Sequence, residues 1–105
     1  MAILQRLPVE EHLLEEFCRQ WRIVKLELFG SMVTEPSSAQ DVDLLVTFAS
    51  DANWGLFEHE RMERELTALL GRNVDLVSRR AIESSSNALR RSAILAGAVP
   101  VYVAG

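Results

Sequence analysis

The amino-acid sequence predicts an α/β or α+β domain in which a mixed sheet of three or four strands carries its long helices mainly on one face. Two observations lead to this class. Segments with apolar residues at helical spacing alternate with short segments of strand periodicity, and glycine, proline or serine residues separate most of them. At 105 residues the chain is long enough for one domain with one core, expected over residues 1–105.

The first two predicted elements are a helix and a strand. Pro8 suits a first helical turn, and apolar residues then recur at helical spacing as far as Trp21. Cys18 lies within this helix, where a lone cysteine is expected to be a buried small hydrophobe. Residues 24–29, VKLELF, alternate apolar and charged side chains as a strand does, and a Gly-Ser pair ends them.

A turn, two strands and a long helix follow. Residues 32–35 leave room for one helical turn, and residues 41–48, DVDLLVTF, predict the second strand. Residues 54–72 predict a second long amphipathic helix, with Gly71 at the point where a helix end favours a left-handed residue. A short strand over residues 73–78, NVDLVS, comes next.

The last predicted elements are a helix and an edge strand. Residues 84–87 contain N-cap candidates for a helix that runs to about Leu95. Residues 99–103, VPVYV, predict a closing strand at the edge of the sheet, where Pro100 is tolerated.

Strand periodicity places acidic side chains together on one face of the sheet. In the strand 41–48, the period of two sends Asp41 and Asp43 to the same face. The opposite face of this strand is continuously apolar and consists of Val42, Leu44, Val46 and Phe48. In the strand 73–78, Asp75 lies on the polar face. If the two strands are neighbours, these three aspartates form one patch.

The three carboxylates predict a site for divalent metal ions. Side chains two apart on a strand start about 6.6 Å apart and can lean toward one point. Paired metal ions in phosphoryl-transfer sites lie about 3.5–4 Å apart. Oxygen ligands of this kind favour two Mg²⁺ ions, with Mn²⁺ as the alternative, and a cation would relieve the repulsion between the carboxylates. Polar residues at a strand end, with no metal role, stay open as the other interpretation.

The Gly30-Ser31 turn adds the second requirement of nucleotide chemistry. A strand that ends in Gly-Ser and enters a short helix presents backbone N–H groups and a hydroxyl at the positive end of a helix dipole, which suits a phosphate. Alone, the pair is also compatible with a plain turn. Together with Asp41, Asp43 and Asp75, it predicts a phosphate site beside a metal site.

Other metal and nucleotide motifs do not match. A calcium-binding loop fails because Leu45 and Val46 occupy positions that need an oxygen ligand and a glycine. The zinc-peptidase motif fails because Glu63 stands where a second histidine would follow His59-Glu60, and we expect both histidines of the chain to be helix-surface groups. No lysine follows a glycine-rich loop, and the glycines lack dinucleotide-binding spacing.

Charge and hydropathy argue against several classes of partner. The net charge is −4, so we expect no direct binding of nucleic acid. The arginine pairs 79–80 and 90–91 are interpreted as solvated surface charges, although contact with a nucleotide or a partner stays open. The apolar runs are too short to span a membrane and the N-terminal segment becomes acidic early, so a cytoplasmic protein without membrane contact is expected.

These motifs resemble the minimal nucleotidyltransferases, or MNT domains, of the DNA polymerase β superfamily. The resemblance rests on LFGS, the eleven residues from Gly30 to Asp41, DVDLLV, a long acidic helix and GRNVDLV. It covers residues 24–77, and the chain length and the C-terminal AVPVYV are similar as well. The resemblance implies the compact nucleotidyltransferase fold, with a single MNT domain over residues 1–105.

The resemblance also implies roles for the site residues. Gly30 and Ser31 would hold the nucleotide triphosphate. Asp41 and Asp43 would bind the two Mg²⁺ ions. Asp75 would bind the catalytic ion beside the attacking hydroxyl.

The function implied by the resemblance is that of an antitoxin. MNT proteins commonly pair with helical HEPN proteins in prokaryotic toxin-antitoxin systems, and the MNT member can transfer AMP from ATP to a tyrosine of the toxin. We therefore expect ATP as substrate and a HEPN-type toxin as partner, since the chain leaves no room for an acceptor-binding domain. Two alternatives stay open, an antitoxin that acts by binding alone and a nucleotidyltransferase for a small-molecule acceptor. The sequence departs from the family at residues 32–35, MVTE, where an arginine is usual, and Arg79 or Arg80 is the candidate replacement.

Overall fold

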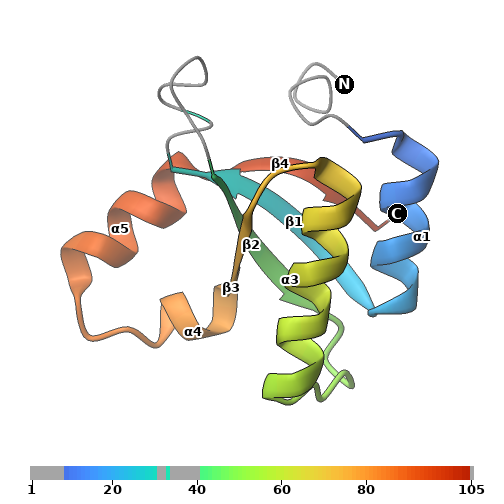
Figure 1. The fold of residues 1–105 in the computed structure, drawn as a ribbon. Helices are drawn as coiled ribbons and strands as arrows, with labels where there is room; N and C mark the ends of the chain where they lie inside the picture. Colours follow the sequence, from blue (N-terminus) through green and yellow to red (C-terminus); the bar gives the residue numbers. More distant parts are fainter. Residues whose placement is uncertain (1–8, 31–32, 34–40, 105) are drawn as a thin grey trace.

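The computed structural model describes residues 9–30, 33 and 41–104, and its elements follow the predicted alternation (Figure 1). They are α1 (Glu11–Gln20), β1 (Ile23–Phe29), β2 (Val42–Phe48), α3 (Leu56–Leu70), β3 (Val74–Ser78), α4 (Arg79–Glu83), α5 (Ala88–Gly97) and β4 (Val99–Val103). The sequence pattern does not predict α4. Helix α5 begins after one of the predicted cap residues, Asn87, whose side chain accepts a hydrogen bond from the Arg90 N–H. Ser31 and the predicted turn at residues 32–35, apart from Val33, lie outside the described residues.

The four strands form one mixed sheet, which confirms the predicted fold class. The strand order is β3-β2-β1-β4, with β1 antiparallel to both β2 and β4, and β2 parallel to β3. The strands β2 and β3 are therefore neighbours, which is the condition for the predicted patch of aspartates. The outer strands of the sheet are β3 and β4.

Helices α1 and α3 lie on one side of the sheet, and α4 and α5 lie on the other (Figure 1). The side under α1 and α3 holds the main core, which includes the predicted apolar face of β2, with Phe48 only partly buried. Cys18 belongs to this core as predicted, and burial raises the pKa of its thiol to about 12. On the other side, Leu45 and Ile82 are buried where α4 contacts β2 and β3. Within the described ranges, no helix is both long enough and apolar enough to cross a membrane.

Side chains of α3 bind the outer edge of β3. Thr67 accepts a hydrogen bond from the Val74 N–H at 3.1 Å, and Glu63 accepts one from the Leu76 N–H at 2.8 Å. His59 Nε2 lies 2.6 Å from the Leu76 carbonyl oxygen, to which its N–H donates. The prediction that His59 is an ordinary helix-surface group is therefore wrong. A spacing of four places it on the same face of α3 as Glu63 and Thr67, and that face meets β3.

Candidate functional site

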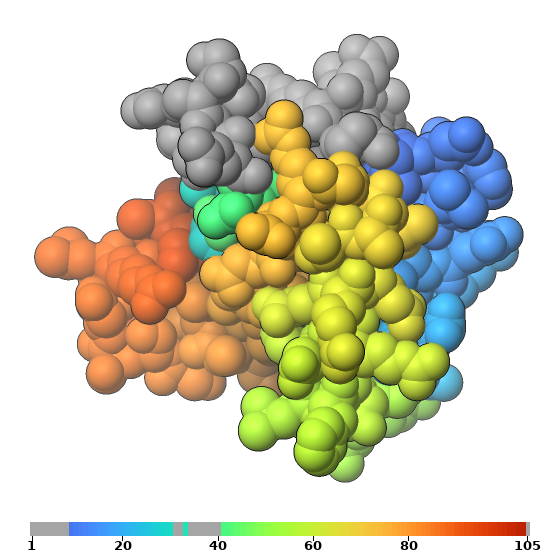
Figure 2. Space-filling model, in the orientation of Figure 1, coloured from blue at the N-terminus to red at the C-terminus, as the bar shows by residue number. Residues whose placement is uncertain are grey.

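The predicted site residues lie at one end of the sheet. Strand β1 ends where β2 and β3 begin, because β1 is antiparallel to β2 while β3 is parallel to it. Phe29, Asp43 and Asp75 occupy directly paired positions on the three strands, so their side chains share a face. In Figure 2 the start of β2, in green, reaches the surface beside β3, in gold, and both Asp41 and Asp75 are exposed. The tertiary structure thus brings Asp43 and Asp75 side by side from separate segments.

Gly30 turns the chain directly against Asp43. Its φ of +76° lies in the left-handed region, which favours glycine. A Cβ on Gly30 would lie 2.5 Å from Asp43 Oδ2, closer than non-bonded atoms approach. The Gly30 carbonyl accepts a hydrogen bond from the Val33 N–H at 3.0 Å, so the chain turns as soon as β1 ends. The backbone of the predicted phosphate turn and the carboxylate of the predicted metal site are therefore in contact, while the role of Ser31 stays a prediction.

The surroundings of Asp43 disfavour the charged form of its carboxyl group. Burial first, then the charges of Asp75 and Asp41, raise its pKa above the ordinary carboxyl range. A divalent cation would offset this repulsion, and a donor set made only of oxygen fits Mg²⁺ or Mn²⁺. In the part of the chain that the structure describes, however, no three Asp, Glu, His or Cys side chains are grouped as a metal site requires. The assignment of Asp41, Asp43 and Asp75 as metal ligands therefore stays a prediction.

Arg79, one of the two candidates for a phosphate-side arginine, is bound to carboxylates away from the turn. Its Nη1 donates to Glu27 Oε1 at 2.6 Å and its Nε donates to Glu83 Oε2 at 3.3 Å. Burial alone would lower the pKa of Arg79, but these two carboxylates raise it. Glu27 is only 4% exposed, and Lys25 Nζ lies 3.7 Å from it. The ion pair fastens α4 to β1.

Sequence reasoning missed the buried position of Glu27. The alternation of β1 correctly assigns it to the face opposite the main core. That face is covered at Glu27 because Arg79 at the start of α4 reaches it, and no local signal indicates this contact. Only one pattern could have suggested that Glu27 is buried in an ion pair. It is a charged residue in the middle of a short strand, combined with an arginine pair just after another strand.

Comparison with known proteins identifies relatives of this fold. The family model of the nucleotidyltransferase domain matches residues 10–99. A solved structure described as a minimal nucleotidyltransferase is 32% identical to the chain, with a TM-score of 0.64, and the match covers 86% of this chain and 87% of that one. No curated protein matches the chain.

Two more distant structures share the fold. A toxin-antitoxin structure with AMP-PNP is 20% identical, with a TM-score of 0.67, and the match covers 90% of this chain and 74% of that one. A tri-AMPylated HEPN toxin from Shewanella oneidensis in complex with an MNT antitoxin matches at 21% identity and a TM-score of 0.60, covering 89% of this chain and 69% of that one. The resemblance to MNT domains is thereby confirmed.

Proposed function

The chain belongs to the nucleotidyltransferase domain family, and from that premise we propose that it is an MNT-type antitoxin that transfers AMP from ATP to a hydroxyl group of a HEPN-type toxin. The observation that carries the proposal is the contact of the Gly30 backbone with the Asp43 carboxylate, with Asp75 paired beside it. This contact joins a turn suited to phosphate and carboxylates suited to a divalent cation at one end of the sheet.

In this proposal each part of the site has a separate task. The Gly30-Ser31 turn holds the triphosphate through backbone N–H groups and the Ser31 hydroxyl. Asp41, Asp43 and Asp75 hold Mg²⁺, which when bound offsets the negative charge that develops on the α-phosphate. The raised pKa of Asp43 supports this assignment, because burial and then the charges of Asp75 and Asp41 disfavour its ionised form, and a bound cation would favour that form.

The proposed reaction is a displacement at the α-phosphorus of ATP. The acceptor oxygen forms a bond to the α-phosphorus. The bond between the α-phosphorus and the bridging oxygen of the β-phosphate breaks, and pyrophosphate leaves with the bridging oxygen. The hydroxyl proton goes to a carboxylate of the site. The residues of the chain contribute mainly by positioning, since the turn holds the phosphates and the strands hold the carboxylates at fixed distances.

The acceptor hydroxyl, proposed to be a tyrosine, belongs to a separate protein. Solved structures with this fold are toxin-antitoxin complexes, and one of them contains a tri-AMPylated HEPN toxin, which supports the same pairing here. The exposed positions of Asp41 and Asp75 also support it, because an acceptor from another molecule can approach exposed carboxylates.

A second candidate function is neutralisation of the toxin by complex formation alone. The contacts of Arg79 favour it, because Glu27 and Glu83 hold this guanidinium group and leave exposed Arg80 as the remaining candidate for the phosphate-side arginine. An active site with no arginine at the phosphates would bind and turn over ATP poorly.

Incubation of the protein with its proposed HEPN-type toxin partner, ATP and Mg²⁺ separates the two functions. Intact-mass spectrometry should detect AMP added to the toxin, and Asp43→Ala should slow this transfer by at least about 100-fold. The control is Asp51→Ala, which removes an exposed aspartate beyond the other end of β2 and should leave transfer unchanged. No adduct with the wild-type protein, or an equal adduct with Asp43→Ala, would contradict transfer. Neutralisation of the toxin by Asp43→Ala without an adduct would support the binding function.

A further inference from the structure

The two edges of the sheet differ in how their backbone groups are covered. At the β3 edge, three α3 side chains form hydrogen bonds to the backbone of Val74 and Leu76. At the β4 edge, no side chain of a described residue makes such a bond. An uncovered outer strand is a site where another extended chain can pair.

The peptide group of Val103 faces outward at the β4 edge. The Ala104 N–H donates to the Val24 carbonyl at 2.8 Å, and Tyr102 is paired with Leu26. Because N–H groups alternate in direction along a strand, the N–H and C=O of Val103 point away from β1. The side chain of Val103 is also 61% exposed. Pro100 has no N–H, so the part of β4 that can pair begins after it.

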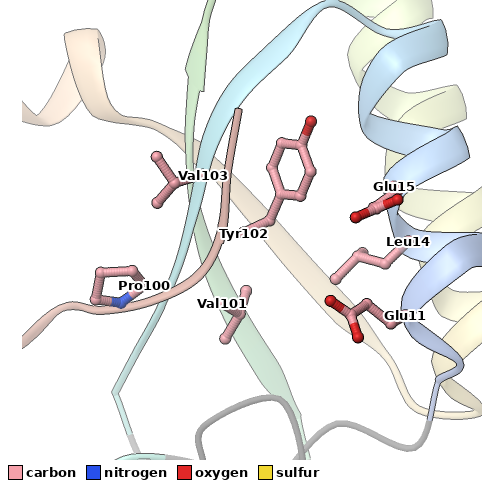
Figure 3. A pocket seen from close by; sticks show the side chains of 7 residues that line it. All are labelled: Glu11, Leu14, Glu15, Pro100, Val101, Tyr102 and Val103. Atoms are coloured by element: carbon pink, nitrogen blue, oxygen red, sulfur yellow. The ribbon is translucent and has the colours of Figure 1, made fainter. Parts of the chain in front are cut away.

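A hollow lies beside this edge, between α1 and β4 (Figure 3). Its volume is about 220 Å³, and Glu11, Leu14 and Glu15 line it on one side, with residues 100–103 on the other. Figure 3 shows the two glutamates and Leu14 pointing from α1 toward Val101 and Tyr102. We call it the α1/β4 hollow.

The charge of the α1/β4 hollow indicates what it can bind. Glu11 is exposed and Glu15 is half-buried, and neither forms an ion pair with a described residue. A cation that reaches the hollow therefore meets two carboxylates without an ion-pair partner among the described residues, although Arg19 lies near enough to act on Tyr102. A second copy of the chain is disfavoured, because pairing of two β4 strands about a two-fold axis would bring the glutamates of both α1 helices to the same face of the joined sheet.

We propose that the β4 edge and the α1/β4 hollow bind an extended segment of a partner protein that contains lysine or arginine. The segment adds a strand beside β4, with backbone hydrogen bonds to Val103. An apolar side chain of the segment enters the hollow, and its basic side chains pair with Glu11 and Glu15. This surface is separated from Asp43 by β1, so binding here does not depend on the proposed transfer of AMP.

The test uses the full chain labelled with ¹⁵N and the nine-residue peptide VTKTVTKTV, in which valine and lysine lie on the same face of an extended strand. We expect the peptide to shift the amide signals of residues 101–104 and to slow hydrogen exchange at the Val103 N–H, which should exchange quickly in the free protein. The double variant Glu11→Gln/Glu15→Gln should weaken binding about tenfold. The control Glu16→Gln, on the same helix but outside the hollow, should leave the affinity unchanged.

Several results would overturn the proposal. One is equal binding of a peptide with glutamate in place of lysine, and another is the absence of binding at millimolar peptide. Signal changes that map away from β4, or unchanged affinity in the double variant, would also overturn it. Slow exchange of the Val103 N–H in the free protein would show that a second copy or the chain itself already covers this edge.

Discussion

Replacement of Gly30 by alanine tests the geometry of the candidate site most directly. A residue with a Cβ costs about 1–2 kcal/mol at a left-handed φ, and Gly30 has a φ of +76°. The thermal midpoint should therefore fall by about 5–10 °C. The new Cβ would also lie 2.5 Å from Asp43 Oδ2, whereas ordinary contacts begin at 3.4 Å. The carboxylate must then move by about 0.9 Å, and a misplacement of about 1 Å can cost about 100-fold in rate.

Gly71→Ala is the matched control, because it separates backbone strain from the collision. Gly71 has a φ of +71°, and no atom lies within 4 Å of an added Cβ. We expect Gly71→Ala to lose a similar amount of stability and to keep the wild-type rate of AMP transfer. Circular dichroism gives the thermal midpoints, and intact-mass spectrometry gives the transfer rates at a temperature well below both midpoints. Equal transfer rates in the two variants would refute the inference that the Gly30 contact positions Asp43.

Three further predictions concern stability and reactivity. Asp43→Asn should raise the thermal midpoint at pH 7 in EDTA. The folded-state pKa of Asp43 is raised, so ionisation opposes folding as the pH rises above the ordinary carboxyl pKa. The gain should vanish near pH 3, and a gain that persists there would contradict this reasoning. Arg79→Met leaves buried Glu27 without its main partner and should lower the free energy of unfolding by about 2 kcal/mol in a urea titration. Arg64→Met, in an exposed ion pair, should change it by less than about 0.5 kcal/mol, and equal losses would rule out a special role for the buried pair. The Cys18 thiol, with its pKa raised to about 12, should resist iodoacetamide at pH 8 until urea unfolds the protein, so rapid labelling of the folded protein would contradict its burial.

Most elements could be predicted from the sequence because their patterns repeat within one segment. The apolar spacing of α3 and the left-handed Gly71 at its end involve only neighbouring residues, and the same is true of the alternation in β2. The five-residue helix α4 is too short to show a helical period. Its one buried residue, Ile82, packs against the sheet, and this contact is not visible in the local sequence. The interpretation of His59 as a surface group was wrong, and the burial of Glu27 was missed, for a related reason. Periodicity assigns a side chain to a face but does not say what covers that face.

In the candidate site, too, some features follow from one segment of the sequence and others depend on contacts between segments. The sequence by itself determined that Asp41 and Asp43 share a face and that Gly30 ends a strand, because both follow from the geometry of a single strand. Only the tertiary structure decided that Asp75 pairs with Asp43 and that the Gly30 backbone contacts the Asp43 carboxylate. The order and direction of strands depend on contacts between segments far apart in the chain, and no local pattern contains that information.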